Sequence, residues 1–155
     1  MHAIAALLIC LVLFAPWPSS ADNPAPYPGT RIVETGKPFE PFVARLRDAI
    51  KDNAMGIVAE ACAHCGAQSI GITIPGNRVI MIFKPPFAVR MLAASEAAGI
   101  EAPLRLYVTE RPDGTARLTY RQPSAVFGAY ENAELTRMGE ELDVIVAKIV
   151  ADALE

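Results

Sequence analysis

The chain has 155 residues, with 14 Lys and Arg against 17 Asp and Glu, a formal net charge of -3 and a pI near 5.4. This acidic balance argues against binding to nucleic acid, which needs Lys and Arg clustered on a positive face. A chain of this length can bury about two-thirds of its unfolded surface, so we expect its folding to depend on neither a disulfide framework nor a metal ion.

The first 21 residues are typical of a secretory signal peptide. The apolar run from Ile4 to Phe14 is too short to span a bilayer, which needs about 20 residues. Small residues then lead to Ala21, and we expect cleavage after it and a mature start at Asp22. The rest of the chain has no apolar run of membrane length. We therefore expect a periplasmic or secreted protein that keeps no membrane anchor after cleavage.

A Pro-rich linker over residues 22–30 is expected to precede a single domain over residues 31–155. The first half of this domain predicts, in chain order, a strand (30–36), an amphipathic helix opened by Pro38, a second strand (57–61) and a third strand (68–74). The third strand is predicted from three isoleucines that alternate with Gly71 and Thr73, a period of two. The second strand leads directly into Cys62.

The second half predicts a strand (79–83), a helix opened by Pro85 and Pro86, a hairpin of two strands (104–110 and 115–121), a loop through residue 130 and a last helix (133–154). The strand over 79–83 has no polar face, which predicts cover on both sides. The hairpin rests on the turn residues Pro112, Asp113 and Gly114. The order β-α-β-β-β-α-β-β-α predicts an α+β fold with a mainly antiparallel sheet and helices packed on one face.

Residues 82–127 combine an apolar strand that ends in Phe, a helix with a Met-Leu pair, a Pro before the next strand, a Gly turn and a Tyr-x-x-Pro end. The residues concerned are Ile82, Phe83, Pro86, Met91, Leu92, Ala102, Pro103, Leu104, Asp113, Gly114, Tyr120 and Pro123. With these features the chain resembles the family of domains of unknown function numbered 302, over residues 31 to about 133. The resemblance implies a curved antiparallel sheet arranged as in the TATA-binding protein, and a homodimer. It implies no assigned reaction.

The chain departs from the pattern of that family at two places. Many members have an Asp-His pair after the second strand, whereas here Ala63 precedes His64. Lys84 and Pro85 stand where a Gly-Asn pair is common. A role tied to the missing Asp, or to the Gly-Asn pair, therefore does not carry over to this chain.

One dense cluster of reactive side chains stands in the sequence ACAHCGAQ and consists of Cys62, His64 and Cys65. Once Cys10 is removed with the signal peptide, the two cysteines are the only thiols of the mature chain. Their Cys-x-x-Cys spacing brings two sulfurs close enough for a disulfide or for two ligands of a metal ion, and His64 adds an imidazole. Covalent haem attachment is excluded, because it needs the His after the second Cys.

Three hypotheses remain open for this cluster. The first is an inert short-range disulfide with His64 pointing to solvent. The second is binding of a soft metal ion, Cu(I) or Zn(II), through Cys62, His64 and Cys65. A fourth ligand would then come from a dimer mate, a water molecule or a Met. The candidates are Met55, Met81 and Met91, although their spacing favours a role in the core.

The third hypothesis is thiol-disulfide exchange by Cys62 and Cys65. In its favour, Pro103 stands at the start of a later strand, as the cis-Pro of a thioredoxin does. Against it, the sequence after Cys65 predicts a strand, whereas a thioredoxin has a helix there that lowers the pKa of its first thiol. We therefore expect a non-catalytic binding or accessory module whose protein partner is unknown, with an oxidoreductase as the alternative.

Overall fold

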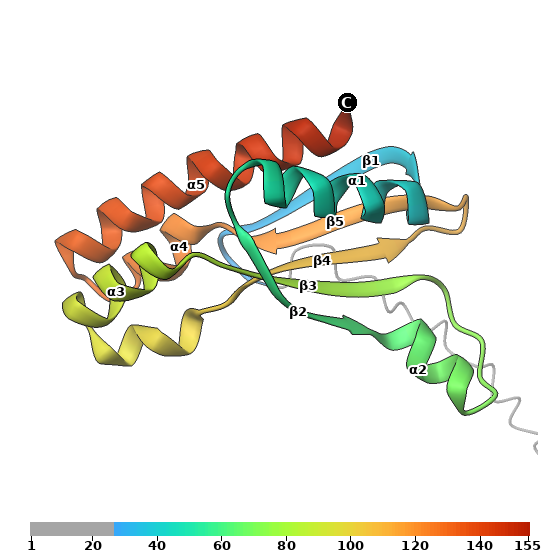
Figure 1. The fold of residues 1–155 in the computed structure, drawn as a ribbon, viewed down its shortest axis with the longest axis horizontal. Coiled ribbons are helices and arrows are strands. Elements are labelled where there is room, and N and C mark those ends of the chain that lie inside the picture. Colours follow the sequence, from blue (N-terminus) through green and yellow to red (C-terminus); the bar gives the residue numbers. More distant parts are fainter. Residues whose placement is uncertain (1–26) are drawn as a thin grey trace, which may run out of the picture.

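The computed structural model describes residues 27–155, so the predicted signal peptide and residues 22–26 of the predicted linker lie outside the described part. The strands are β1 (Thr30–Pro38), β2 (Gly56–Cys62), β3 (Asn77–Phe83), β4 (Leu104–Glu110) and β5 (Thr115–Arg121). They form one sheet in the order β1-β5-β4-β3-β2, in which all neighbours are antiparallel (Figure 1). The predicted hairpin is confirmed, with Leu106 opposite Tyr120.

The helices are α1 (Phe39–Asp52), α2 (Ala63–Ser69), α3 (Pro85–Ala94), the 3-10 helix η1 (Glu96–Glu101), α4 (Pro123–Gly128) and α5 (Ala133–Leu154). In Figure 1, α3, η1 and α4 gather near one end of the molecule, and α2 projects from the other end. The α+β prediction is confirmed. Within residues 27–155, none of the helices has both the length and the apolar character that a membrane crossing requires.

The main core lies between one face of the sheet and helices α1 and α5. Alternate strand residues enter it, because side chains of a strand point to opposite faces in turn. Its fully buried members include Val43, Leu46, Ile50, Ile80, Ile82, Leu106, Val108, Leu118 and Ile149. Burying each such side chain stabilises the fold by about 1.5–3 kcal/mol. A second cluster lies where α3 and α4 meet α5, around Met91, Phe127 and Met138.

Strand β3 is fully buried on only one face. Ile80 and Ile82 have 0% exposure, whereas Val79, Met81 and Phe83 on the other face stay partly exposed. Among the described residues, α1 and α5 supply the core partners of the buried face. The prediction of cover on both sides therefore holds for one face only.

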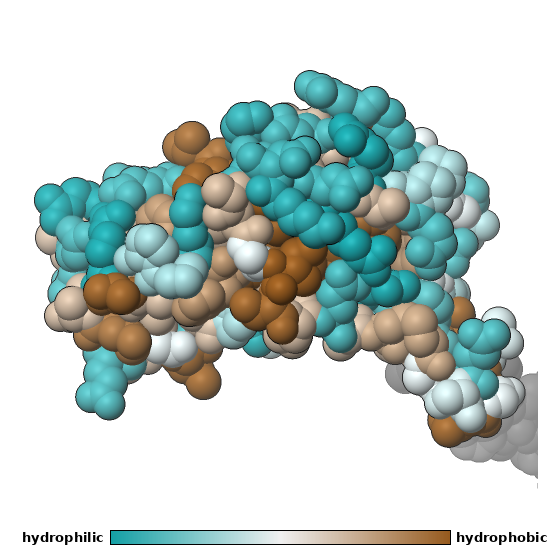
Figure 2. All heavy atoms as spheres, viewed as in Figure 1, coloured by the Kyte–Doolittle hydropathy of each residue, from teal (hydrophilic) through white to brown (hydrophobic). Residues whose placement is uncertain are grey.

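The third predicted strand, over residues 68–74, is wrong. Helix α2 runs to Ser69, and Gly71 follows with φ +77°, a left-handed conformation that ends regular structure there. The isoleucines that suggested a strand bury no common face: Ile70, Ile72 and Ile74 are 72%, 51% and 40% exposed. Figure 2 shows apolar side chains at the tip of the projection that α2 and its loop form.

Two short helices are absent from the predicted order of elements. Helix α2 directly follows β2, where a further strand was expected, and α4 occupies part of the segment expected to be a loop. Pro123 begins α4, a position where the missing N–H of proline costs no hydrogen bond. The observed order is therefore β-α-β-α-β-α-β-β-α-α, with η1 before β4.

Candidate metal and thiol site

The two cysteines lie where the edge strand β2 passes into α2. Cys62 is the last residue of the strand and Cys65 belongs to the first turn of the helix. They form a disulfide with a Cα–Cα distance of 5.3 Å. The backbone N–H of Cys65 donates a hydrogen bond of 3.2 Å to Cys62 Sγ, so this sulfur caps the helix. The expectation that no helix follows the first cysteine is therefore wrong.

The imidazole of His64 lies against both sulfurs. Both ring nitrogens lie 3.5 Å from Cys62 Sγ, and Nε2 also lies 3.7 Å from Cys65 Sγ. The ligand atoms of the three residues all lie within 4.8 Å of one another. The His64 side chain is only 21% exposed, so it does not point to solvent as the inert-disulfide hypothesis assumed. The structure thus brings together all three residues that the sequence singled out.

Two neighbours orient the His64 ring. Its Nδ1 lies 3.0 Å from both the backbone N–H and the backbone carbonyl oxygen of Asn77. The ring of Phe39 meets it edge to face, with 5.7 Å between ring centroids. The Asn77 N–H donates to Nδ1, and this hydrogen bond corresponds to the tautomer with its proton on Nε2. Metal binding through Nε2 requires the other tautomer, in which the proton is on Nδ1 and is donated to the Asn77 carbonyl. Metal-ligating histidines are commonly held in this way.

The turn that leads into Asn77, the first residue of β3, is itself anchored to β4. The N–H of Gly76 donates to Glu110 Oε2 at 2.7 Å, and the N–H of Glu110 donates to the Gly76 carbonyl at 2.8 Å. A Cβ at position 76 would lie 2.6 Å from atoms of the Phe39 ring, so only glycine fits without movement. The sequence predicts a turn here, but it gives no signal that this turn orients His64.

A network of charged side chains borders the cysteines on the same face of the sheet. Arg78 lies directly opposite Cys62 in the β2–β3 pairing, and its Nη1 is 3.4 Å from Glu60 Oε2. Glu60 also accepts two hydrogen bonds from Arg47, at 2.6 and 2.7 Å. These hydrogen bonds from Arg47 are the main reason that the pKa of Glu60 lies below its usual value.

Glu40, in the first turn of α1, joins this network to His64. Its Oε1 lies 3.7 Å from His64 Nε2 and also 3.7 Å from Arg78 Nη2. Its side chain is 63% exposed, and so can adjust its position. Sequence reasoning missed Glu40, because it stands 22 residues before Cys62 and no local pattern connects the two.

The methionines proposed as a fourth ligand lie elsewhere. Met55 and Met91 are buried, with exposures of 4% and 3%, which confirms their role in the core. Met81 alternates with Ile80 and Ile82, so it lies on the opposite face of β3 from Arg78 and the network beside Cys62.

The comparison of Pro103 with a thioredoxin cis-Pro is wrong, because Pro103 does not lie beside the cysteines. The Ala102–Pro103 bond is cis and directly precedes β4. Leu104 at the start of β4 pairs with Ile82 of β3, whereas Cys62 pairs with Arg78 near the other end of that strand. Pro103 therefore lies far along the sheet from the cysteines and cannot contact a substrate bound at their sulfurs.

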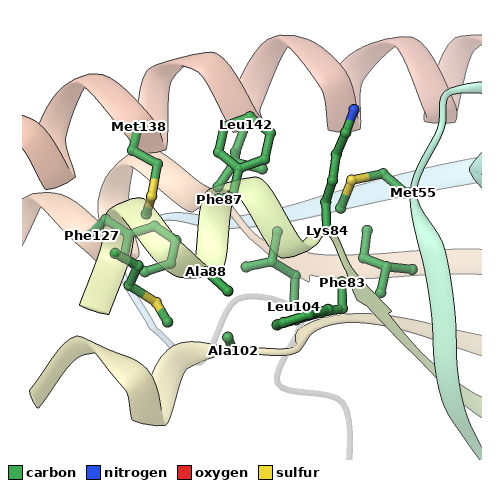
Figure 3. A pocket seen from close by; sticks show the side chains of 12 residues that line it. Met55, Phe83, Lys84, Phe87, Ala88, Ala102, Leu104, Phe127, Met138 and Leu142 are labelled. Atoms are coloured by element: carbon green, nitrogen blue, oxygen red, sulfur yellow. The ribbon is translucent and has the colours of Figure 1, made fainter. Parts of the chain in front are cut away.

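A small apolar cavity lies between β3, β4, α3, α4 and α5 (Figure 3). Its lining includes Phe83, Phe87, Leu104 and Phe127, with Lys84 as the one charged side chain. Its volume is about 30 Å³, room for one or two water molecules, whereas ligand pockets usually measure about 300–1,000 Å³. This cavity is therefore a packing feature of the core.

Comparisons with known proteins agree on the family and the fold. The family model described as "Domain of unknown function DUF302" matches residues 31–153. Among solved structures, the crystal structure of an uncharacterized conserved DUF302 protein from Bacillus stearothermophilus is similar with a TM-score of 0.72 and 16% sequence identity. The match covers 82% of this chain and 99% of that chain. No curated protein shows significant similarity to the chain.

Proposed function

Because the chain belongs to the DUF302 family, a family of unknown function, we propose its function from the site itself: the reduced cluster of Cys62, His64 and Cys65 binds a metal ion, Cu(I) or Zn(II). Thiolate and imidazole are the ligands that these ions prefer. In this proposal the protein is a binding or accessory module and catalyses no reaction.

One observation carries the proposal, namely the distance of His64 Nε2 from the two sulfurs. The two distances are 3.5 and 3.7 Å. In a tetrahedral zinc site, bonds of about 2.3 Å to sulfur and about 2.05 Å to nitrogen place these ligand atoms about 3.6 Å apart. Nε2 therefore has the spacing of a ligand from each sulfur. Two changes complete the site: reduction of the disulfide lets the sulfurs separate, and the ring turns to aim the Nε2 lone pair at the metal ion, because Nδ1 also lies 3.5 Å from Cys62 Sγ.

The proposed binding depends on the redox state of the pair. A metal ion needs the two sulfurs as thiolates, and the disulfide supplies neither. A disulfide of a small molecule or of another protein can oxidise the pair: it gains two electrons from the thiolates, the Cys62–Cys65 bond forms and the metal ion is released. Because exported proteins meet such oxidants, the protein holds its metal ion only while a thiol reductant of that compartment keeps the pair reduced.

Thiol-disulfide exchange is a second candidate, favoured by the hydrogen bond from the Cys65 N–H to Cys62 Sγ. In the reduced protein, a backbone N–H that donates to this sulfur at the start of a helix suits an attacking thiolate. The thiolate would attack a disulfide of a partner protein and release one partner thiolate. Cys65 would then attack the mixed disulfide, form the Cys62–Cys65 bond and release the second partner thiolate. The partner gains the two electrons that the pair loses.

Metal titration and a reductase assay distinguish these functions. The residues 22–155 protein, reduced and kept free of oxygen, is titrated with Zn(II) and with Cu(I), and the same protein is assayed for reduction of insulin. A binding module takes up one ion per chain, loses this uptake on Cys62→Ser and reduces no insulin. An oxidoreductase reduces insulin and has a low thiol pKa. Ser69→Ala, at the end of the same helix, is the matched control, and we expect it to behave as the wild type.

Export, a homodimer and a curved sheet arranged as in the TATA-binding protein complete the proposal. Export is supported by the apolar run and the small residues before Asp22. Mass spectrometry of periplasmic material should find a chain that begins at Asp22, and a chain that begins at Met1 would contradict export. Light scattering after size-exclusion chromatography should give twice the chain mass if the protein is a homodimer.

A further inference from the structure

His64 Nε2 has one more neighbouring metal-ligand group than the sequence predicts. Besides the two sulfurs, the carboxylate of Glu40 approaches this nitrogen, with 3.7 Å between Nε2 and Oε1. Glu40 belongs to a different element from the cysteines and His64, namely the first turn of α1. The two cysteine sulfurs and the Glu40 carboxylate thus each approach His64 Nε2, which is their common neighbour.

We infer that Glu40 is the fourth ligand and that the site is a tetrahedral Zn(II) site made of Cys62, Cys65, His64 and Glu40. This inference rests on the proposed metal-binding function and names its metal. Zinc bonds of about 2.05 Å to nitrogen and about 2.1 Å to oxygen place these two ligand atoms about 3.4 Å apart. The observed 3.7 Å is close to this distance, and the exposed Glu40 side chain can close the difference by a small rotation.

The surroundings of Glu40 suit a metal-binding carboxylate. Arg78 Nη2 lies 3.7 Å from the same Glu40 oxygen, and Arg78 is in turn paired with Glu60. Carboxylate ligands of metal ions are usually held by such outer partners, which fix their orientation. Zn(II) with two thiolates and one carboxylate has a net charge of -1, which the guanidinium of Arg78 offsets. Arg78 is thus a positioning residue for Glu40.

The fourth ligand decides between the two candidate metals. Zn(II) takes four ligands in closed protein sites, and a carboxylate oxygen is one of the ligands it accepts. Cu(I) is a softer ion that prefers sulfur and has little affinity for a carboxylate, so two thiolates and an imidazole satisfy it. If Glu40 is a ligand, its loss weakens the binding of Zn(II) and leaves the binding of Cu(I) unchanged.

The test compares the affinities of reduced variants for Zn(II) and for Cu(I), measured separately by competition with chelators. Glu40→Gln removes the charge, Glu40→Asp keeps the charge but shortens the reach, and Glu96→Gln is the control at an exposed glutamate in the first turn of η1. We expect both Glu40 variants to bind Zn(II) at least about 10-fold more weakly, because even the loss of an outer partner of a metal ligand weakens binding about 10- to 100-fold. Their Cu(I) affinity and the Zn(II) affinity of Glu96→Gln should equal those of the wild type.

Absorption of the Co(II)-substituted protein provides a second readout. Glu40→Gln should change the d–d bands, which report the ligand set, while the thiolate-to-cobalt charge-transfer bands remain. Glu40 is exposed, so we expect every variant to fold as the wild type, which circular dichroism checks.

Each outcome decides a separate point. Equal Zn(II) affinity and an unchanged Co(II) spectrum in Glu40→Gln would overturn the role of Glu40 and leave the proposed function standing. An equal loss for Zn(II) and Cu(I), or full Zn(II) affinity in Glu40→Asp, would also overturn that role, because either result indicates an effect of charge alone. Uptake of Cu(I) but not Zn(II) by the wild type would overturn the zinc assignment. Uptake of neither ion would overturn the proposed function and this inference with it.

Discussion

His64 Nδ1 lies 3.0 Å from both the backbone nitrogen and the backbone carbonyl oxygen of Asn77, while the other ring nitrogen, Nε2, lies 3.5 and 3.7 Å from the two cysteine sulfurs. The contacts with Asn77 join residues that are 13 positions apart and lie on α2 and β3. Because Asn77 is the first residue of a sheet strand, both contacts to the imidazole come from backbone atoms that the sheet holds in place. The proposed role of His64 as a ligand therefore starts from a ring whose position is fixed by the fold.

We predict that His64→Ala weakens metal binding by the reduced protein at pH 7. The substitution removes one of the proposed ligands, and an affinity loss of at least about 10-fold is expected for Zn(II). Chelator competition measures the loss. Ser69→Ala serves as the control on the same helix. Equal affinities of His64→Ala and the wild type would show that the imidazole is no ligand.

Gly76→Ala should destabilise the fold and disturb the site together. The new Cβ would lie 2.6 Å from atoms of the Phe39 ring, so the ring or the loop has to move. We expect a loss of about 1–3 kcal/mol in the free energy of unfolding, typical of an overpacked site, and weaker metal binding because Asn77 follows Gly76. Urea denaturation measures the first effect. Gly66→Ala is the matched control, since its Cβ would meet nothing within 4 Å.

The sequence predicts those features of the fold and the site that depend on residues close together in the chain. The hairpin of β4 and β5 was predictable because Pro112, Asp113 and Gly114 form a turn between two runs rich in strand formers. The reactive cluster was visible because its three residues lie within four positions. Both features depend on neighbours in the chain alone.

The remaining features depend on packing that no local pattern records. Helix α2 was missed because its seven residues include none that is buried, so it lacks the apolar face that predicts a helix. The alternating isoleucines after it imitated a strand although they lie exposed in a loop. Glu40 and Asn77 reach His64 only because α1 and β3 meet at the end of β2, and this meeting is decided by the core.

The double substitution of Cys62 and Cys65 by Ser should leave the fold intact. The disulfide closes a very short loop and stabilises the fold by only about 2 kcal/mol on the chain-entropy model, whereas the core lies in the sheet and in α1 and α5. We expect a cooperative unfolding transition at a lower urea concentration. A broad, non-cooperative transition would contradict this expectation. The oxidised wild type is the reference.

The ion pair of Glu60 with Arg47 gives a prediction about pH. The hydrogen bonds from Arg47 lower the pKa of Glu60 in the folded protein, so the pair stabilises the fold fully above the unfolded pKa of about 4.3. This stabilisation is lost as the pH falls from that value through the lower folded pKa. Glu60→Gln should therefore cost about 0.5–1 kcal/mol at pH 7, and the difference from the wild type should shrink below about pH 4.

Urea denaturation of both proteins at pH 7 and at low pH measures this difference. Asp48→Asn is the control, since Asp48 lies on the same helix as Arg47 but pairs weakly with Lys51 at 4.0 Å. A difference between Glu60→Gln and the wild type that stays constant with pH would contradict the linkage.

Metal uptake by the wild-type protein in its two redox states tests the central claim most directly. The residues 22–155 protein is prepared once with the Cys62–Cys65 disulfide intact and once fully reduced, and the bound zinc of each sample is counted after excess metal has been removed. We predict one Zn(II) per chain in the reduced protein and none in the oxidised protein. Equal uptake in both states, or no uptake by the reduced protein, would contradict the claim that these residues form a redox-dependent metal site.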